Sequence, residues 1–244
     1  MANHPEFIAH RGYARHFPEN TLAAVRGAIE VGARFVEIDV QLSRDGVPYL
    51  MHDRTLERMC GVAGSIGERT SAELAALRAA EAEKFGARFA NEPVATLAGF
   101  VDLLARNAGV HAFVELKRAS LESFGRAAVL DAVVLLLAPI ARRCTLISFD
   151  VEVLALARER TKLPVGPVLI HWSQIASVEI ARLKPEIVFC DFEKLPDGAL
   201  RSPCGDLAVY EVDAVAVARA LAARGVRFIE TFAVGEMKRA LESS

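Results

Sequence analysis

The sequence predicts an α/β fold in which eight parallel strands close into a (β/α)8 TIM barrel, with a small insertion after the second strand. Short apolar runs alternate with segments of helical periodicity along most of the chain. The 244 residues, of which 52% are hydrophobic, match the usual size of one barrel and its core. Because no Pro/Gly/Ser-rich linker divides the chain, we expect a single domain over 1–244.

Eight apolar runs of strand length account for the predicted barrel. Parallel strands with short connections close most naturally into a barrel, and functional groups then gather at the carboxyl ends of the strands. The predicted strands cover residues 7–9, 35–40, 110–116, 144–149, 165–170, 187–191, 207–212 and 227–231, with helices between and after them.

The first predicted strand ends in a charged pair, His10-Arg11. Gly12 follows it and lets the backbone turn sharply. Asn20 or Thr21 can then cap a helix whose apolar residues recur at helical spacing. A proton carrier, a fixed cation and a helix N-terminus thus meet at one strand end, and this combination suits an anionic group such as a phosphate.

Two carboxylates and a second histidine come next in the chain. Glu37 and Asp39 are two residues apart on the second predicted strand, so both point to the same side of it. Asp45-Gly46 is a strong turn signal, and we expect a hairpin whose return strand delivers His52 beside the other strand ends.

Residues 54–93 interrupt the strand-helix alternation. They are rich in Ala and Glu, and a helix is predicted over 71–82. Because the segment offers no barrel strand, we expect an insertion over one end of the fold, in the position of a lid. The alternation then resumes, with helices predicted over 97–106 and 121–141.

Composition excludes several classes of protein. The formal net charge of −2 provides no basic field for nucleic acid. The four cysteines are far apart and form no CxxC pair, which is typical of reduced cytosolic thiols. The longest apolar stretch, 127–140, contains Asp131 and is too short to span a bilayer. We therefore expect a cytoplasmic protein without an integral membrane segment; the oligomeric state is not indicated.

The charged residues at the strand ends are more informative together than singly. Glu37 and Asp39 alone could be a solvated edge, and Glu115 with Lys117 could be a simple salt bridge. Three carboxylates on adjacent strands, however, repel one another unless a positive charge lies between them. Because all the candidate ligand atoms are oxygens, Mg²⁺ or Ca²⁺ is favoured over zinc.

The remaining strand-end residues fit the hydrolysis of a phosphodiester. A bound metal together with Arg11 and Lys117 would neutralise a phosphoryl group. His10 and His52 then remain free to take and give protons near neutral pH, and the residues leave open which is the acid and which the base. Phe149 falls at a strand end of the same rim.

The order and spacing of these motifs resemble the glycerophosphodiester phosphodiesterase family. The resemblance covers essentially the whole chain and is most specific over the first 55 residues. The motifs that carry it are His10-Arg11-Gly12, Pro18-Glu19-Asn20-Thr21, Glu37-Ile38-Asp39, His52-Asp53, Thr55-Leu56, Glu115-Leu116-Lys117 and Ser148-Phe149-Asp150.

The resemblance implies a (β/α)8 barrel with a small insertion after the second histidine. It also implies metal-dependent hydrolysis of a small-molecule glycerophosphodiester to sn-glycerol 3-phosphate and an alcohol, and a cyclic phosphate intermediate has been proposed for the family. By this resemblance the paired histidines are His10 and His52, the metal carboxylates are Glu37, Asp39 and Glu115, and the phosphate-contacting residues are Arg11 and Lys117.

Two strand ends in the last third of the chain differ from the family pattern. Where the family often has Trp in a Trp-Thr-Val-Asn-like run, this chain has Tyr210-Glu211-Val212-Asp213. The usual Thr-Asp at the end of the last strand is replaced by Glu230-Thr231. Both differences lie where the alcohol portion of the substrate would rest. We expect Phe149 and Tyr210 to belong to the residues that contact the substrate or its phosphate.

Two alternative functions remain open from the sequence. A related phosphodiesterase could act on another diester, such as a lysophospholipid, and would need an exposed apolar groove. The candidates for such a groove in the insertion are Leu74, Leu77, Phe85 and Phe89. A non-catalytic barrel that binds phosphorylated ligands is the second alternative, but pure binding would not require an acid-base pair.

Overall fold

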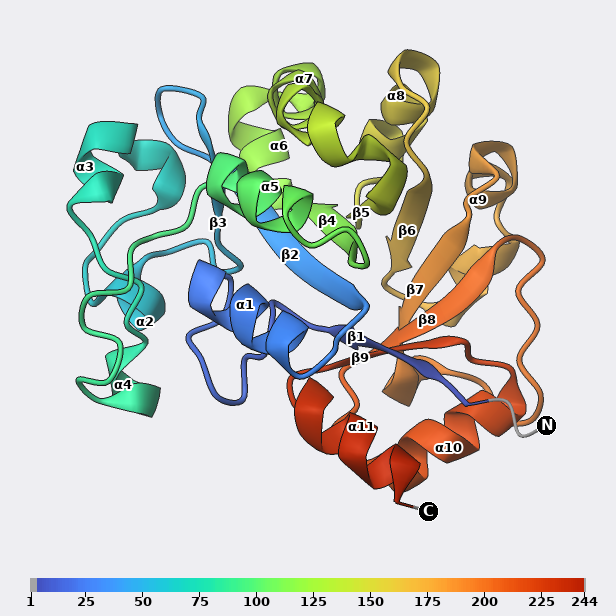
Figure 1. Cartoon of the computed structure of the whole chain (residues 1–244). Coiled ribbons are helices and arrows are strands. Elements are labelled where there is room, and N and C mark those ends of the chain that lie inside the picture. The colour runs from blue at the N-terminus through green and yellow to red at the C-terminus, as the bar shows by residue number, and fades with distance from the viewer. Residues whose placement is uncertain (1–3, 244) are drawn as a thin grey trace.

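Parallel strands form a closed barrel at the centre of the computed structural model, which describes residues 4–243 (Figure 1). Within that range, eight parallel strands pair in the order β1-β9-β8-β7-β6-β5-β4-β2, and β1 also pairs with β2 to close the barrel. The predicted fold class is therefore confirmed. The strands are β1 (Glu6–Ala9), β2 (Phe35–Leu42), β4 (His111–Leu116), β5 (Cys144–Ser148), β6 (Val165–Leu169), β7 (Ile187–Asp191), β8 (Asp206–Tyr210) and β9 (Phe228–Thr231).

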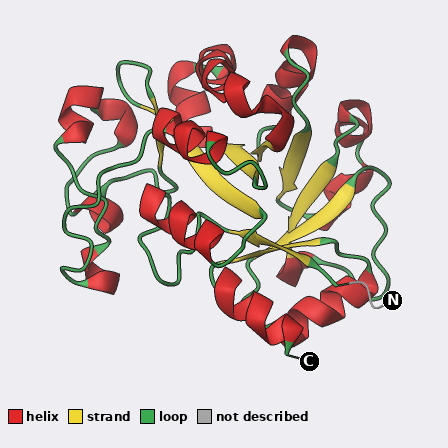
Figure 2. Cartoon of the chain, viewed as in Figure 1, coloured by secondary structure: helices red, strands yellow, loops and turns green. Residues whose placement is uncertain are grey.

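Helices surround the sheet on its outer side (Figure 2). They are α1 (Leu22–Glu30), α5 (Leu97–Ala105), α6 (Arg118–Phe124), α7 (Arg126–Leu137), α8 (Val151–Arg160), α9 (Val178–Leu183), α10 (Val215–Arg224) and α11 (Val234–Glu242). Of the two caps considered for the first helix, Thr21 is the one used, because its hydroxyl accepts from the amide of Ala24.

The long helix predicted over 121–141 is wrong in its extent. Gly125 adopts φ +83, a left-handed conformation, and separates α6 from α7. After α7 the chain tightens into a 3-10 helix, Ala138–Arg143, which contains Pro139. The helical periodicity of the sequence thus predicts the apolar face of this region, but it does not show that Gly125 and the 3-10 segment with Pro139 interrupt the helix.

A helix was also expected between the strands now called β7 and β8, and this prediction is wrong. Within the described residues this connection contains a single 3-10 helix, Phe192–Lys194, and otherwise irregular chain. Pro196, Gly198, Pro203 and Gly205 follow closely on one another here. Prolines lack the amide that a helix interior needs, and glycines favour turns, so the segment stays a loop.

The hairpin and the insertion follow the second strand. The predicted hairpin is confirmed: β3 (Pro48–Leu50) runs antiparallel to β2. The insertion contains α2 (Glu57–Cys60), a 3-10 helix (Ile66–Glu68), α3 (Ser71–Ala75) and α4 (Ala82–Phe85), which lie to one side of the barrel near α1 (Figure 1). The helix predicted over 71–82 begins at Ser71 as expected but is wrong in its extent, because α3 ends at Ala75 and Arg78 instead pairs with Pro93 in an antiparallel bridge.

The insertion and the end of the preceding hairpin share one apolar core. Its buried members include Met51, Leu56, Met59, Ile66 and Leu74, none of them more than 2% exposed. The insertion is therefore a packed unit and not a loose loop. Its action as a lid stays a prediction.

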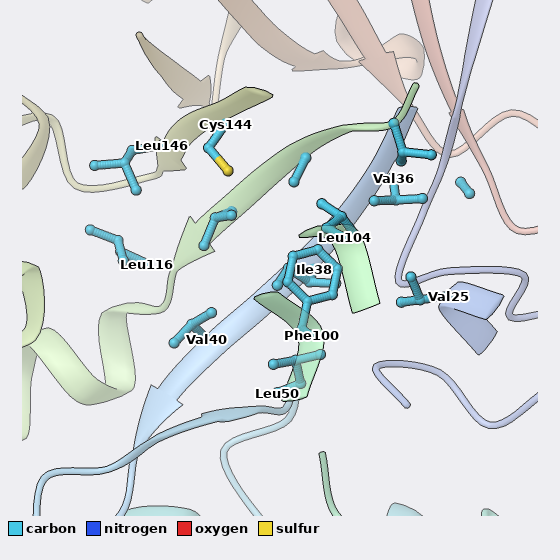
Figure 3. Packing of buried hydrophobic residues seen from close by; sticks show 14 of the residues in the cluster. Val25, Val36, Ile38, Val40, Leu50, Phe100, Leu104, Leu116, Cys144 and Leu146 are labelled. Atoms are coloured by element: carbon cyan, nitrogen blue, oxygen red, sulfur yellow. The ribbon is translucent and has the colours of Figure 1, made fainter. Parts of the chain in front are cut away.

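Two apolar layers position the strand ends. Outside the sheet, Ile38 and Val40 of β2 belong to the same buried cluster as Phe100 and Leu104 of α5 (Figure 3). Inside the barrel, a second cluster contains Ile8, Phe113, Ile147, Phe189, Ala208 and Phe228. Because side chains alternate along a strand, the residue two positions after each interior residue also points inward, at the carboxyl end.

Within residues 4–243 no single helix has the length and apolarity needed to cross a membrane. A bent pair, Arg118–Phe124 with Arg126–Arg143 at 117°, meets those length and composition criteria only when taken together. Residues 1–3 and 244 of the predicted domain lie outside the described residues, and the domain boundaries stay a prediction.

Candidate active site

The loop after β1 holds the first histidine and arginine in a fixed conformation. The amide of His10 donates to the carbonyl of Thr231 at 3.1 Å, which extends the pairing between β1 and β9. Arg11 has φ +55, an uncommon conformation for a side chain of this size. Gly12 has φ +81, and a Cβ there would lie 2.6 Å from the carbonyl carbon of Ala24. The sharp turn expected at Gly12 is confirmed.

His10 lies in a buried and strongly charged position. Its Nε2 is 3.6 Å from Oε2 of Glu37, and its Nδ1 is 3.5 Å from Oε1 of Glu211. The imidazole stacks on Phe232 with ring centroids 4.8 Å apart. Burial lowers the pKa of His10 well below its ordinary value, and the positive charge of Arg11 lowers it further. The structure thus favours a neutral imidazole.

Carboxylates surround the guanidinium of Arg11. Burial alone would lower the pKa of Arg11, but Asp39 and Glu19 outweigh it and raise that pKa above its usual value. Arg11 therefore stays a fixed cation at this strand end. Its Nη1 donates to Oε1 of Glu19 at 3.0 Å, its Nε lies 3.4 Å from Oδ2 of Asp39, its Nη2 lies 3.5 Å from Oε1 of Glu211, and its backbone amide donates to Oε2 of Glu37 at 3.0 Å.

The three carboxylates predicted as metal ligands are brought together. Glu37, Asp39 and Glu115 each offer one oxygen within 4.8 Å of the others. Asp39 and Glu115 are direct neighbours in the β2–β4 register, which accounts for their proximity. Lys117 Nζ lies 3.0 Å from Oδ1 of Asp39 and 3.0 Å from Oε1 of Glu115. The side-chain amide of Asn20 donates to Oδ2 of Asp39 at 2.8 Å.

The pKa values of these carboxylates are shifted in opposite directions by their surroundings. Burial would raise the pKa of Asp39, but Lys117 and Arg11 overcome it and hold that pKa well below its usual range. Burial raises the pKa of Glu37 strongly, and the neighbouring Asp39 charge adds to the rise. Burial also raises the pKa of Glu115 to about 7, although Lys117 opposes this. The cluster therefore holds more acidic groups than its two cations can keep ionised.

The donor set fits a hard divalent cation. Within residues 4–243, the buried Oε1 atoms of Glu37 and Glu230 have no hydrogen-bond partner. A buried carboxylate oxygen without a partner is costly, and a metal ion would satisfy it. Oxygen donors from several carboxylates are what Mg²⁺ and Ca²⁺ prefer.

The second histidine reaches the rim from the hairpin. Nδ1 of His52 lies 2.9 Å from Oδ1 of Asp53, and the imidazole is 35% exposed. Asp53 in turn accepts from Arg58, and Arg58 donates to Glu19. Since Glu19 also holds Arg11, a continuous chain of contacts joins His52 to the first strand end.

The two predicted substrate-contact residues lie on the other side of the rim. Phe149 and Tyr210 are partly buried and pack against the cluster inside the barrel. The hydroxyl of Tyr210 is 3.5 Å from the carbonyl of Leu169. Burial raises the pKa of Tyr210 above its usual value, so the phenol stays protonated. Their contact with a substrate stays a prediction.

Sequence reasoning missed three acidic residues of this site. Glu230 is 3% exposed and has an oxygen within 4.8 Å of ligand atoms of both His10 and Glu37. It comes two positions after the interior residue Phe228, so the alternation rule alone could have found it. Glu211 faces Arg11 and His10, and Glu19 lies within a motif noted for its helix cap and for the family resemblance, with no role given to Glu19 itself.

The N-terminus of α1 was expected to favour a phosphate, but backbone amides of its first turn already donate to side chains of the protein. The amide of Ala24 donates to Oγ1 of Thr21, and the amide of Ala23 donates to Oε1 of Glu92 at 3.2 Å. These groups of α1 are therefore already satisfied, and the positive charge at this rim comes from Arg11 and Lys117.

Fold and site together define a (β/α)8 barrel protein with a buried acidic cluster, two paired cations and two histidines at its carboxyl end. The sequence profile of the "Glycerophosphoryl diester phosphodiesterase family" matches residues 10–195. The chain belongs to this family.

Curated relatives match part of the chain. A "Glycerophosphodiester phosphodiesterase" of Caldanaerobacter subterraneus subsp. tengcongensis is 41% identical over 97 residues, which is 40% of this chain and 39% of that protein. "Glycerophosphodiester phosphodiesterase 1" of Homo sapiens is 40% identical over 90 residues, which is 37% of this chain and 27% of that protein. The chain thus aligns with less than half of the length of either relative.

Solved structures resemble the whole chain. A phosphodiesterase of Oleispira antarctica, in complex with the product sn-glycerol-3-phosphate, superposes with a TM-score of 0.83 at 23% identity, over 98% of this chain and 97% of that one. A glycerophosphodiester phosphodiesterase of Agrobacterium tumefaciens superposes with a TM-score of 0.75 at 26% identity, over 96% and 99%. The barrel is thus shared along its whole length.

Proposed function

We propose that the chain hydrolyses glycerophosphodiesters to sn-glycerol 3-phosphate and an alcohol, with a divalent cation held by Glu37, Asp39 and Glu115. The observation that carries this proposal is the buried carboxylate cluster beside Arg11 and Lys117 in a member of this family. The Oleispira antarctica protein, which shares the fold, holds sn-glycerol-3-phosphate, the product expected here. The proposal leaves both Mg²⁺ and Ca²⁺ open and places the chain in the cytoplasm, as the sequence predicts.

Fixed positive charge is the first contribution of the site. When bound, the cation would supply charge neutralisation and polarisation at the phosphoryl group. Arg11 is held in place by Glu19 and Asp39, and Lys117 by Asp39 and Glu115, so neither has to reorganise when a phosphate arrives. Preorganised cations of this kind stabilise charge that develops in the transition state.

Proton transfer is the second contribution. His10 is buried with a neutral imidazole favoured, and His52 is partly exposed on the hairpin. One of them would take a proton from the nucleophile while the other protonates the departing alkoxide oxygen. The assignment of the two roles between them stays open.

The nucleophile can be the substrate itself. The glycerol 2-hydroxyl is adjacent to the phosphorylated oxygen, and well-oriented intramolecular groups reach effective molarities of about 10⁵–10⁸ M. Attack by this hydroxyl would release the alcohol and leave a cyclic phosphate, which water then opens. Direct attack by water is the competing route.

A 2-deoxy analogue of the substrate distinguishes the two routes. If the analogue is turned over at least ~10²-fold more slowly than its parent, a loss of about 2.7 kcal/mol, the result supports cyclisation. Equal rates for the two compounds support attack by water.

The structure gives a lysophospholipid less support than a small glycerophosphodiester. Leu74, one candidate for an apolar groove, is fully buried in the core of the insertion. Among the described residues the exposed large apolar side chains are Leu135, Val178 and Val217, all outside residues 54–93. The other candidates, Leu77, Phe85 and Phe89, are partly exposed, so the insertion offers a long acyl chain less apolar surface than all four candidates together would give.

A turnover screen tests the proposed function. The purified chain is assayed with several glycerophosphodiesters and a lysophospholipid, with and without Mg²⁺ or Ca²⁺. We expect metal-dependent release of glycerol 3-phosphate from at least one glycerophosphodiester. Faster turnover of the lysophospholipid than of every glycerophosphodiester would favour the first alternative. Binding of glycerophosphodiesters without any turnover, at saturating metal, would favour a non-catalytic barrel.

A further inference from the structure

We propose that Arg58, on helix α2 of the insertion, is a positioning residue that sets the orientation of both His52 and Arg11. The inference rests on the proposed function and gives the insertion a part in it. It follows from three contacts of one guanidinium group, each to a carboxylate with a different task.

Each nitrogen of the Arg58 guanidinium has its own carboxylate. Nε donates to Oδ2 of Asp53 at 2.7 Å, Nη2 to Oε1 of Glu19 at 2.6 Å, and Nη1 to Oε1 of Glu81 at 3.2 Å. The planar fork of an arginine can serve three acceptors in fixed directions at once, whereas a lysine ammonium is a single point charge. The geometry of the contact is therefore specific to arginine.

The contact with Asp53 acts on His52. One oxygen of Asp53 faces Nδ1 of His52 at 2.9 Å, and the other accepts from Arg58. The carboxylate is thus fixed from both sides and can hold the proton of His52 on Nδ1. Nε2 is then left as the nitrogen available to a substrate, which is how a second carboxylate commonly sets the tautomer of a working histidine.

The contact with Glu19 acts on Arg11. A single oxygen of Glu19 accepts from Nη2 of Arg58 at 2.6 Å and from Nη1 of Arg11 at 3.0 Å. The side chain of Glu19 is 8% exposed and that of Arg58 is 36% exposed, so water screens these bonds only in part. Without Arg58, Glu19 would lose the group that holds it opposite Arg11.

The insertion in turn holds Arg58 in place. Glu81, its third partner, is 5% exposed, and the amide of Glu81 donates to the carbonyl of Met59 at 3.0 Å. Met59 itself is buried in the apolar core of the insertion. The packed insertion therefore fixes the guanidinium, which then fixes two residues of the rim.

Replacing Arg58 should lower turnover more than binding. Arg58→Lys keeps the charge and most of the volume, but its three N–H groups share one nitrogen and lack the planar spread that reaches the three carboxylates. Arg58→Met removes the charge. Because small misplacements of reacting groups cost up to about 10²-fold, we expect kcat to fall ~10–10²-fold in either variant while KM changes less than ~3-fold. Arg78→Lys is the matched control, since Arg78 is an exposed arginine of the same segment that donates to the backbone carbonyls of Ala75 and Leu77.

A double-mutant cycle and NMR separate positioning from general stability. If Arg58 acts partly through Asp53, Arg58→Lys should cost clearly less in an Asp53→Asn background than alone. In ¹H–¹⁵N spectra the imidazole of His52 should be protonated on Nδ1 in the wild type and lose this preference in Arg58→Lys. Additive kinetic losses, or an unchanged kcat with an unchanged His52 tautomer, would overturn the inference. The NMR arm needs no turnover, so a wild type inactive in every assay would count against the proposed function alone.

Discussion

The two sides of the barrel rim differ in chemical character. The ends of β1, β2 and β4 carry charges that fix one another, such as the buried Arg11 and Asp39 and the partly buried Lys117. The ends of β5 and β8 present the aromatic side chains Phe149 and Tyr210. The family match, over residues 10–195, includes the first side and also Phe149, but it stops before β8 and β9.

This difference indicates a division of labour. Buried ion pairs depend on several partners at once, so a change at any one of them disturbs the others. Aromatic rings at a rim can be exchanged at lower cost, because they contact a ligand mainly through area. We infer that the first side sets the reaction and that the second side sets which alcohol is accepted.

The histidines should give the largest effect of a substitution at the rim. His10→Ala and His52→Ala should each lower kcat by roughly 10²–10⁴-fold, the usual contribution of a positioned acid or base. His16→Ala is the control, because His16 is a half-exposed histidine near β1 that pairs with Glu236. Circular dichroism and melting would check the fold of each variant. Near-normal turnover in either variant would refute the assignment.

The aromatic side should give a smaller effect with a different kinetic signature. Phe149→Ala and Tyr210→Ala should raise KM about tenfold, equivalent to about 1.4 kcal/mol of lost contact, while kcat changes less. The ranking of substrates with different alcohols should also change, as measured by kcat/KM across the panel. A loss confined to kcat with an unchanged ranking would mean that this side belongs to the reaction after all.

The sequence predicted the first side better than the second for a physical reason. Alternation along β2 and β4 brings Glu37, Asp39 and Glu115 to one side, and the pattern is visible because charged residues stand out in apolar runs. On β9 the same alternation rule places Glu230 inside the barrel. In the sequence, however, the pair Glu230-Thr231 stands out only as a difference from the Thr-Asp of the family pattern. Glu211 follows the last residue of β8, so the alternation of side chains along a strand does not place it. Its approach to His10 depends on the path of the chain after β8.

The barrel strands were predictable, whereas the missing helix between β7 and β8 and the interruptions within helices were not. Every barrel strand was anticipated, since each is a short apolar run. The break at Gly125 coincides with a glycine at φ +83, and α3 ends at Ala75, but apolar periodicity marks neither point. The link from His52 through Asp53 to Arg58 joins residues of two segments, and only their tertiary arrangement shows it.

Metal dependence is the most direct test of the claim that the first side of the rim carries the reaction. The protein is treated exhaustively with a chelator, checked by elemental analysis, assayed with a glycerophosphodiester and then assayed again after addition of Mg²⁺ or Ca²⁺. We expect activity to be lost and then restored. Glu37→Gln, Asp39→Asn and Glu115→Gln should each require more metal, because an amide is a poorer ligand for a hard cation. Full activity of a metal-free protein would instead mean that Arg11 and Lys117 alone balance the carboxylates, and it would contradict the account.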